Sequence, residues 1–456
     1  MSDKLHEECG VFAIRLPEPA DIPSLVQMGI FALQHRGEEA CGIAVASQHE
    51  FRIDKDLGIV SQVFGEQRLA NLRFDTAHLG IGHTRYVTKG SNIRNDAGPL
   101  TLHTKSGSLA LSHNGGFTNA QEIKAELLAR GISFQTTNES EVMLKLIAST
   151  PDLPTEDAIA AAMHELTGGF SVTLMDNECI YAARDRHGIR PLMIGALDGG
   201  YVFASEIGAL HVIGAEFVRE VGHGELVTAG PNGLTSRQVL PSTPAPCAFE
   251  WIYFARGDSR MDGVEVHDAR LRLGAELARE MPVDADIVVG VPESGLTAAI
   301  GYARASGIPY DAGLYRSPYA GRTFINPTPR LRDRKVQVKF GATAAVRGKR
   351  VVLVDDSVVR GTTSGRIVNL LREAGATEVH FRVSSPPVKH PCFYGIDTAA
   401  RKDLAAAKMT IAQIQDRIGA DSLAFLSEAG LKRALTLHDL CLACFNGDYP
   451  AGKIAD

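Results

Sequence analysis

One stretch decides the fold of this chain: Val351-Val-Leu-Val-Asp355-Asp-Ser-Val-Val-Arg360-Gly-Thr-Thr-Ser-Gly365. Its Val/Leu run is typical of a buried parallel strand, and it leads into two carboxylates and a loop of glycine and small hydroxyl residues. A helical pattern over Ile367–Ala374 follows, with Gly375 as its stop. Backbone N–H groups at such a helix start form an anion site, although the loop lacks the Gly-Lys-Ser/Thr of a Walker A loop. From this pattern alone, an ordinary turn whose Asp residues cap the helix is as good an interpretation as a ligand loop.

The stretch belongs to a half of the chain in which strands alternate with longer helices. This half begins after a proline-rich linker pattern at Pro241–Pro246. Its predicted elements are strands at Ile287–Val291, Val351–Val354 and Val379–Val383 and helices at Leu296–Ala305 and Ile367–Ala374. Alternation of this kind predicts a parallel sheet that binds ligands at the carboxyl ends of its strands. Ser294 lies at such an end, where it would face Asp355 and Asp356.

Basic residues gather between Ser294 and Asp355, at Arg330–Lys339 and again at Arg347, Lys349 and Arg350. A charge run is usually a solvated face, but this chain carries a formal net charge of -6. A basic cluster beside an anion-binding loop therefore favours a polyphosphate ligand. Nucleic acid is the competing ligand, and the segment lacks the interleaved aromatic residues that would stack on bases, apart from Phe340.

The composition is that of a soluble globular protein with two to three domains: 456 residues, 45% hydrophobic and 22% charged. No apolar run approaches the roughly 20 residues that a membrane helix needs. The charged Met1–Glu8 lacks the apolar core of a signal peptide. Seven cysteines, an odd number in a long chain, argue against a secreted disulfide framework. We therefore expect a cytoplasmic protein with neither nucleic acid nor membrane as a partner.

Residues 9 to about 240 carry a different pattern, in which short strands and turn signals alternate with helices. Strands are predicted at Gly10–Ile14, Gly42–Ala46, Leu109–Ser112, Phe170–Met175 and Ile180–Ala183. Asp176-Asn177 and Asp198-Gly199-Gly200 supply hairpin turns. Helices are predicted at Leu25–Leu33, Ala120–Ala129, Glu141–Ala148 and Thr155–Leu166. The mixture predicts an antiparallel, layered α/β domain.

Cys9 is the cysteine of interest in this half. If the Glu8–Cys9 bond were cut, Cys9 would carry its thiol and a free α-amino group together. An α-amine titrates near pH ~8, close enough to neutrality to act as a base for the thiol. A buried structural cysteine is the simpler interpretation of a lone Cys near a terminus.

Three other segments favour chemistry at Cys9. Arg85, in His83-Thr-Arg-Tyr86, offers a guanidinium suited to a carboxylate. Ser112-His-Asn-Gly-Gly116 offers a side-chain amide and a flexible backbone N–H, two donors of the kind from which an oxyanion hole is built. Gln34-His-Arg-Gly37 closes a helix, and a purely structural role is open for it.

Together these segments resemble the class II (N-terminal nucleophile) glutamine amidotransferases. The resemblance implies Cys9 as nucleophile, Arg85 as ligand of the glutamine carboxylate, and Asn114 and Gly115 as the oxyanion hole. Where that family has an Asp for the substrate amino group, this chain has Glu139.

The Val354–Thr363 segment resembles the phosphoribosyl pyrophosphate (PRPP) loop of type I phosphoribosyltransferases. That resemblance implies Asp355 and Asp356 at the ribose hydroxyls and at Mg²⁺, with Ser294 near the metal–pyrophosphate end. Ser357 belongs to the same PRPP-binding loop, and Arg360, Gly361, Thr362 and Thr363 would hold the 5′-phosphate. The basic residues of the 330s would form a closing loop.

Four cysteines remain: Cys247, Cys392, Cys441 and Cys444. Four thiolates hold either Zn²⁺ or an iron–sulfur cluster, and the spacing alone favours zinc, with scattered core cysteines as the alternative. Their sequence contexts resemble a subgroup of the amidophosphoribosyltransferase family that carries a [4Fe–4S] cluster and an N-terminal propeptide, here Met1–Glu8. Cys41 and Cys179 are predicted to be core residues.

Both modules in this order resemble the amidophosphoribosyltransferase family. The resemblance implies a propeptide at 1–8, an αββα glutaminase domain at 9–240 and a type I phosphoribosyltransferase domain at 250–456. Ammonia from glutamine would pass through an internal channel to C1 of PRPP. A homotetramer inhibited by purine nucleotides is also implied. The rivals are another class II amidotransferase, such as a sugar-phosphate aminating enzyme, and a PRPP-binding regulator that has lost catalysis.

Overall fold

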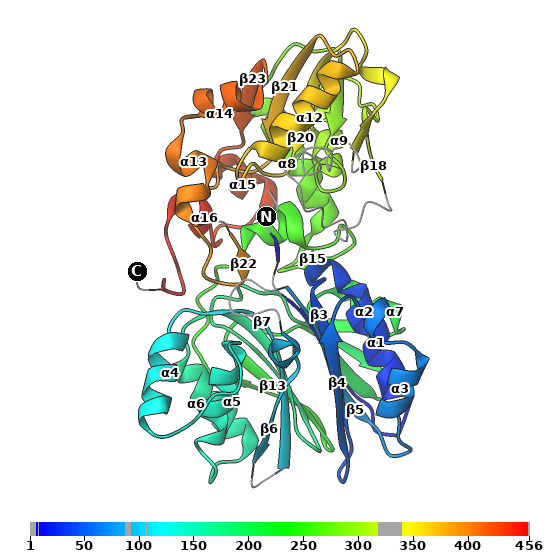
Figure 1. The fold of residues 1–456 in the computed structure, drawn as a ribbon, viewed down its shortest axis with the longest axis vertical. Helices are drawn as coiled ribbons and strands as arrows, with labels where there is room; N and C mark the ends of the chain where they lie inside the picture. The colour runs from blue at the N-terminus through cyan, green and yellow to red at the C-terminus, as the bar shows by residue number, and fades with distance from the viewer. Residues whose placement is uncertain are drawn as a thin grey trace.

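The computed structural model describes residues 6–7, 9–86, 93–104, 107–317, 340–398 and 400–454, which fold into two lobes (Figure 1). The amino-terminal lobe is a sandwich of two mainly antiparallel sheets with helices on both outer faces. The carboxy-terminal lobe is built on a parallel sheet. The predicted fold class is thus confirmed.

The first sheet of the sandwich has seven strands in the order β12–β10–β11–β2–β5–β3–β4. Their bounds are Glu216–Glu220, Met193–Leu197, Gly200–Ala204, Cys9–Arg15, Leu79–Arg85, Ala40–Ala46 and Phe51–Leu57. Its outer face is covered by α1 (Ile22–Ala32), α2 (Val60–Val63), α3 (Glu66–Leu72) and α7 (Ile207–Val212).

The second sheet has six strands in the order β14–β13–β9–β8–β7–β6. Their bounds are Gly233–Gln238, Glu225–Gly230, Ile180–Arg184, Gly168–Met175, Gly107–Phe117 and Leu100–Thr104. Its outer face packs on α4 (Ala120–Ala129), α5 (Ser140–Ala148) and α6 (Thr155–Glu165).

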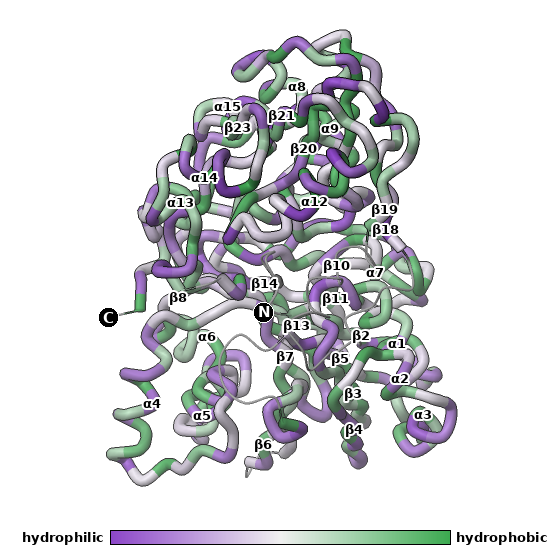
Figure 2. Tube along the Cα trace, turned by 45° about the horizontal axis from the view of Figure 1, so that its top comes forward, coloured by the Kyte–Doolittle hydropathy of each residue, from purple (hydrophilic) through white to green (hydrophobic). Residues whose placement is uncertain are grey.

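Small and branched apolar side chains fill the space between the two sheets. Val11, Ala13, Leu79 and Ile81 of the first sheet pack in one buried cluster with Ala110 and others of the second. Figure 2 shows the corresponding hydrophobic colour along strands such as β3, whereas α3 on the surface is largely hydrophilic. Because side chains alternate along a strand, this cluster fixes which residues of each strand point into the sandwich.

The parallel sheet of the second lobe has the order β17–β20–β21–β23 (Ile287–Gly290, Arg350–Asp355, Glu378–Val383, Ser422–Phe425). One face packs on α8 (Val266–Glu280), α9 (Gly295–Ser306) and α15 (Glu428–Leu435). The other packs on α12 (Thr362–Glu373), α13 (Ala405–Lys408) and α14 (Ile411–Ile418). Ligand-binding loops are expected where the parallel strands end, at Pro292, Asp356 and Ser384.

The remaining described elements are short. They are η1 (Gln34–Arg36), η2 (Arg94–Asp96), the π-helix η3 (Glu250–Phe254), β15 (Arg260–Met261) with β16 (Val264–Glu265), β18 (Leu314–Arg316) with β19 (Phe340–Ala342), η4 (Ala344–Val346), η5 (Arg401–Asp403) and α16 (Ala443–Asn446). Strand β1 (His6–Glu7), which precedes Cys9, pairs with β22 (Ile396–Asp397) of the second lobe. No helix within the described ranges combines the length and apolarity needed to cross a membrane.

Candidate active sites

The first candidate site lies at one end of the sandwich, where Cys9 begins β2. Its register partner on β5 is Arg85, so the two residues lie side by side on the same face. Val11 and Ile81 of these strands point into the sandwich, and alternation therefore directs Cys9, His83 and Arg85 inward as well. Cys9 is only 9% exposed.

Asn114 comes to the same interior from the opposite sheet. It lies four residues after Ala110 on β7, and Ala110 belongs to the interior cluster. Asn114 is fully buried, and neither atom of its amide has a hydrogen-bond partner among the described residues. The same holds for one terminal nitrogen of Arg85. Buried polar atoms of this kind are normally satisfied, so the pair is suited to a polar ligand.

Gly115 is required by its backbone conformation and by its neighbour. Its φ of +134° is one that side chains rarely adopt, and a Cβ there would lie 2.1 Å from the carbonyl oxygen of Gly169. The strand can therefore place the Asn114 amide and the Gly115 backbone next to each other only with glycine at this position.

Glu139 precedes α5 and contacts the strand that carries Asn114. Its carboxylate accepts a hydrogen bond from the Phe117 N–H at 3.0 Å. Ser140 then pairs with His113 Nδ1 at 2.9 Å. These two contacts hold the loop before α5 against β7. The Glu139 side chain, one methylene longer than the Asp of the resembling family, lies against the backbone of that strand.

Two buried histidines lie next to this site and are neutral. The pKa of His83 and that of His113 are both lowered to about 3, chiefly because burial disfavours the imidazolium. His83 Nε2 lies 2.9 Å from the carbonyl oxygen of His113 and must therefore carry the proton. These histidines connect the two sheets without adding charge.

The second candidate site follows the carboxyl end of β20. Asp355, Asp356 and Ser357 are buried, and Ser357 donates to Asp356 at 2.5 Å. The hydroxyl of Ser294, which follows β17 and is the N-cap residue of α9, donates to the other oxygen of Asp356. The structure thus brings Ser294 to the Asp355–Asp356 loop as predicted.

The rest of the loop leads into α12. Gly361 adopts a φ of +80° immediately before the helix, which begins at Thr362 and continues through Thr363. The Arg360 Nε is buried without a hydrogen-bond partner among the described residues. The Gly361–Thr363 backbone therefore has the geometry of a helix start, where N–H groups favour an anion.

The residues of the predicted basic cluster that the structure describes do not lie beside this loop, contrary to the prediction. Arg330–Lys339 lies outside the described residues. Arg350 begins β20, whereas Asp355 ends it, and five residue steps of strand separate their Cα atoms by roughly 17 Å. Arg350 instead forms ion pairs with Asp284 and Asp286. Arg350, with Lys349 and Arg347 before it, therefore belongs to the amino end of the strand, away from the anion loop.

Cys247, Cys392, Cys441 and Cys444 come together at the boundary of the lobes. The backbones of Cys247 and Cys441 pair in an isolated parallel β-bridge. Cys444 interacts electrostatically with the other three cysteines. Burial raises the pKa of the Cys247 and Cys444 thiols and raises that of Cys441 to about 12. In the described part of the chain, no three His, Cys, Asp or Glu residues lie as a group that could hold a single metal ion. Of the two predicted core cysteines, Cys41 is buried and Cys179 is half-buried.

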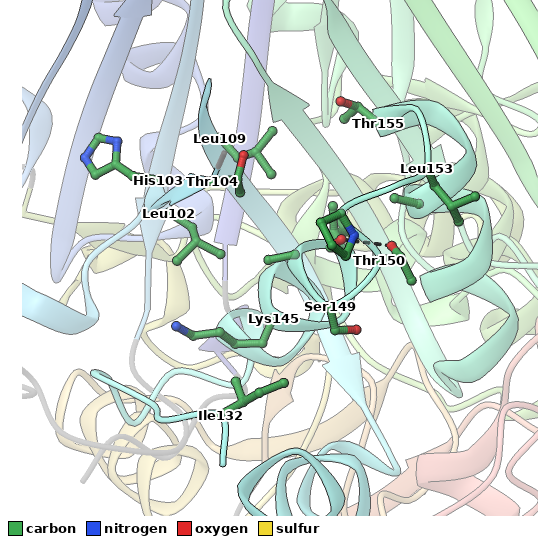
Figure 3. A pocket seen from close by; sticks show the side chains of 14 residues that line it. Leu102, His103, Thr104, Leu109, Ile132, Lys145, Ser149, Thr150, Leu153 and Thr155 are labelled. Atoms are coloured by element: carbon green, nitrogen blue, oxygen red, sulfur yellow. Dashed lines mark hydrogen bonds between the residues drawn. The ribbon is translucent and has the colours of Figure 1, made fainter. Parts of the chain in front are cut away.

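A cavity of about 610 Å³ lies elsewhere, between the edge strand β6 and the end of α5 (Figure 3). Leu102, Ile132, Lys145 and Leu153 are among its lining residues. None of the predicted site residues lines it, so this cavity is separate from both candidate sites.

Sequence reasoning missed a set of buried charges at the boundary of the lobes. Arg36 of the Gln34–Gly37 segment pairs with Glu206 and Glu250, and Arg190 pairs with Glu250 as well. The available signal was a charged residue inside an apolar run, as in Phe249-Glu250-Trp251, because such a residue needs a buried partner.

Comparisons with known proteins match both halves of the chain. A glutamine amidotransferase domain model matches residues 83–212, and a phosphoribosyl transferase domain model matches residues 264–389. The amidophosphoribosyltransferase of Synechocystis sp. is 47% identical over 98% of this chain and 92% of that relative. The Bacillus subtilis amidophosphoribosyltransferase is 44% identical over 98% and 94%. The structure of the glutamine PRPP amidotransferase from B. subtilis complexed with ADP and GMP matches with a TM-score of 0.92 at 43% identity, covering 98% of each chain.

The fold and the two matched domains define a glutamine amidotransferase joined to a phosphoribosyltransferase. The chain belongs to the amidophosphoribosyltransferase family. Its reaction converts PRPP, glutamine and water into 5-phosphoribosylamine, pyrophosphate and glutamate, the first step of purine nucleotide synthesis.

Proposed function

We propose that Cys9 is the nucleophile of the glutaminase half-reaction and that Asp355–Thr363 binds the PRPP that accepts the ammonia. One observation carries the first assignment: Cys9 and Arg85 are register partners on a buried face of the sandwich, and the unpartnered amide of Asn114 lies on the inner face of the opposite sheet. In this division residues 1–8 are a propeptide, 9–240 the glutaminase domain and 250–456 the phosphoribosyltransferase domain.

The glutaminase residues divide the chemistry among them. Arg85 binds the carboxylate of glutamine, and Glu139 binds its amino group. The Cys9 thiol gives its proton to the α-amine and attacks the side-chain amide, whose oxygen receives hydrogen bonds from Asn114 and the Gly115 N–H. The carbon–nitrogen bond breaks, ammonia leaves with that proton, and water then hydrolyses the thioester to glutamate.

Removal of residues 1–8 is part of this proposal, because the nitrogen of Cys9 is a base only as an amine. In the intact chain the backbone of His6–Glu7 is held by β22, two residues before Cys9. Cleavage after Glu8 would release that strand from the boundary of the lobes.

The PRPP residues hold the acceptor sugar. Asp355 and Asp356 bind the ribose hydroxyls, and the Arg360–Thr363 segment binds the 5′-phosphate at the helix start, with Ser357 in the same PRPP-binding loop. Mg²⁺, held by Ser294, Asp355 and Asp356, would neutralise the departing pyrophosphate. Ammonia reaches C1 through an internal channel, forms the new carbon–nitrogen bond and displaces pyrophosphate.

We also propose that Cys247, Cys392, Cys441 and Cys444 hold a [4Fe–4S] centre, which takes four thiolates. The electrostatic contact of Cys444 with the other three supports this assignment. The Tyr394 N–H donates to Cys392 Sγ at 3.3 Å, the kind of hydrogen bond that sulfur ligands of such clusters receive. We assign the cluster a structural or oxygen-sensing role, since the reaction has no redox step. Iron and sulfide analysis of anaerobically purified protein should find both, with a brown colour that air removes. A colourless protein that contains zinc would contradict the cluster.

Purine nucleotides are the proposed inhibitors, and the related B. subtilis enzyme, whose structure is complexed with ADP and GMP, supports this assignment. We also propose a homotetramer and a cytoplasmic location. Sedimentation analysis tests the assembly, and inhibition by added ADP and GMP tests the regulation.

One assay tests the central proposal. Purified protein with PRPP, Mg²⁺ and glutamine should release pyrophosphate and glutamate in equal amounts, and ammonia should replace glutamine. Mass spectrometry of the same active protein should show that Met1–Glu8 is missing. An intact Met1 on fully active enzyme would overturn the free-amine mechanism.

A further inference from the structure

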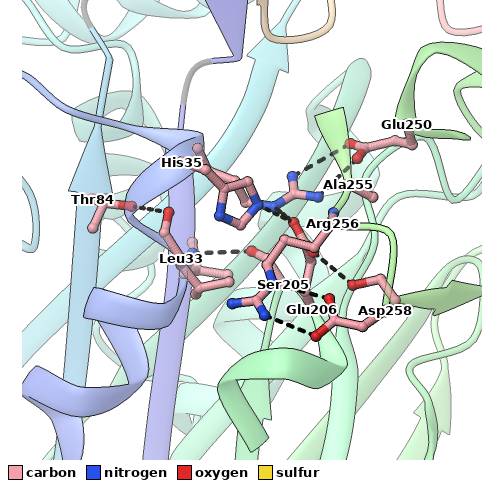
Figure 4. Close-up of polar contacts among 12 residues, drawn as sticks. Leu33, His35, Thr84, Ser205, Glu206, Glu250, Ala255, Arg256 and Asp258 are labelled. Carbon is pink, nitrogen blue, oxygen red and sulfur yellow. Dashed lines mark hydrogen bonds and ion pairs between the residues drawn. The ribbon is translucent and has the colours of Figure 1, made fainter. Parts of the chain in front are cut away.

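Four fully buried charges connect the two lobes, and Figure 4 shows the two carboxylates among them, Glu206 and Glu250. Arg36, Arg190, Glu206 and Glu250 are each at most 1% exposed, and their two positive and two negative charges balance. Arg36 donates to Glu206 and, at 2.8 Å, to Glu250. Arg190 donates to Glu250 at 3.0 Å. Because Glu250 lies in the π-helix η3, two guanidinium groups of the first lobe meet one carboxylate beyond the linker.

Ser259 of the second lobe holds the other carboxylate. Its hydroxyl donates to Glu206 at 2.6 Å, and the backbone N–H of Arg256 donates to the same oxygen at 3.0 Å. The ion pair with Arg36 and the contacts with His35 and Ser259 keep the pKa of Glu206 well below its ordinary value despite complete burial. Glu206 is thus ionised and fully bonded.

The network continues directly to the glutamine site. Arg36 precedes Gly37, where a Cβ would lie 2.7 Å from the backbone of Arg85. The N–H of Glu39 donates to the Arg85 carbonyl at 3.0 Å. On the other side, Ser205 accepts the Val11 N–H at 3.0 Å, two residues after Cys9. The Arg36–Gly37 turn and the Ser205–Glu206 segment therefore pack on the two strands that carry Arg85 and Cys9.

We infer that Glu250 and Ser259, although they belong to the second lobe, are positioning residues for the glutamine site. They fix Arg36 and Glu206, and these fix the turn that packs on Arg85. Removing one partner leaves a buried charge uncompensated, so the turn should shift to restore its contacts. A small displacement of Arg85 would weaken glutamine binding while leaving the Asp355 loop unchanged.

The inference rests on the proposed function, and substituted enzymes test it. Glu250→Gln keeps the shape of the side chain and removes its charge. We expect its KM for glutamine to rise roughly tenfold or more, while its rate with ammonia stays within about twofold of wild type. Ser259→Ala removes one hydrogen bond and should raise the KM roughly threefold. The surface ion pair Arg256–Asp258 offers the control Asp258→Asn, which should leave both rates unchanged.

The outcomes separate positioning from general stability. Equal losses with glutamine and ammonia would overturn the inference, as would an unchanged glutamine KM in Glu250→Gln. If that variant fails to fold, Ser259→Ala decides alone, and an unchanged KM there would overturn the inference. A wild-type enzyme inactive with both nitrogen sources would instead count against the proposed function.

Discussion

The two candidate sites are built in opposite ways. The proposed glutamine site takes Cys9, Arg85 and Asn114 from three strands of two sheets, and each strand is hydrogen-bonded to a neighbouring strand on both sides. The proposed PRPP site takes most of its residues from one continuous loop after β20, joined to the loop after β17 by the Ser294–Asp356 hydrogen bond. A site on strand interiors is positioned by the whole sandwich, whereas a loop site is positioned by a few side chains. The two half-reactions should therefore be separable by substitution.

The largest separation is expected from Cys9→Ala. Loss of the thiol removes the nucleophile, so the glutamine-dependent rate should fall by about 10³-fold or more. The rate with ammonia should persist, because the Asp355–Thr363 loop is untouched. Both rates can be measured as pyrophosphate release. Retained glutamine-dependent activity would remove Cys9 from the mechanism.

Asn114→Ala tests the opposite sheet of the same site. Loss of one oxyanion donor costs about 10²–10³-fold in kcat, so thioester formation from glutamine should slow by that factor. The KM for glutamine should change less, because Arg85 and Glu139 hold the substrate in the ground state. An equal loss with ammonia would show that the variant had disturbed the second lobe.

Asp355→Asn should produce the reverse pattern. The weaker binding of the sugar hydroxyls and of Mg²⁺ should lower phosphoribosylamine formation roughly 10²-fold with either nitrogen source. Glutamate release in the absence of PRPP should be unchanged, since Cys9 and Arg85 lie in the other lobe. A parallel fall in that release would mean that the sites are not separable.

The same contrast explains what the sequence could predict. The Asp355–Thr363 loop was predictable because its residues are contiguous and follow a strongly apolar run. Local periodicity also predicted α4 with its observed bounds, Ala120–Ala129. The predicted strand Leu109–Ser112 was too short. The observed strand continues to Phe117 because β8 pairs with it through the glycine-rich segment, which has little strand propensity of its own.

Contacts between distant segments were beyond local reasoning. Arg350 belongs to a basic run, yet it pairs with Asp284 and Asp286 at the amino end of its strand. Arg36 and Glu250 lie on opposite sides of the linker, and only the docking of the lobes brings them together. Neither spacing nor propensity contains that information, because both describe a single segment.

The smallest expected effect concerns stability and again distinguishes the sandwich. The pKa of His83 and that of His113 are lowered to about 3 by burial, whereas an unfolded histidine titrates near 6.5. Between these values the unfolded chain binds more protons, so stability falls as pH falls, by up to about 1.4 kcal/mol per pH unit for each histidine. Urea denaturation of the full chain at pH 7, 6 and 5 should show this slope. His113→Asn should remove the share of one histidine, up to about 1.4 kcal/mol per pH unit. An unchanged slope in that variant would mean that His113 is protonated in the folded sandwich.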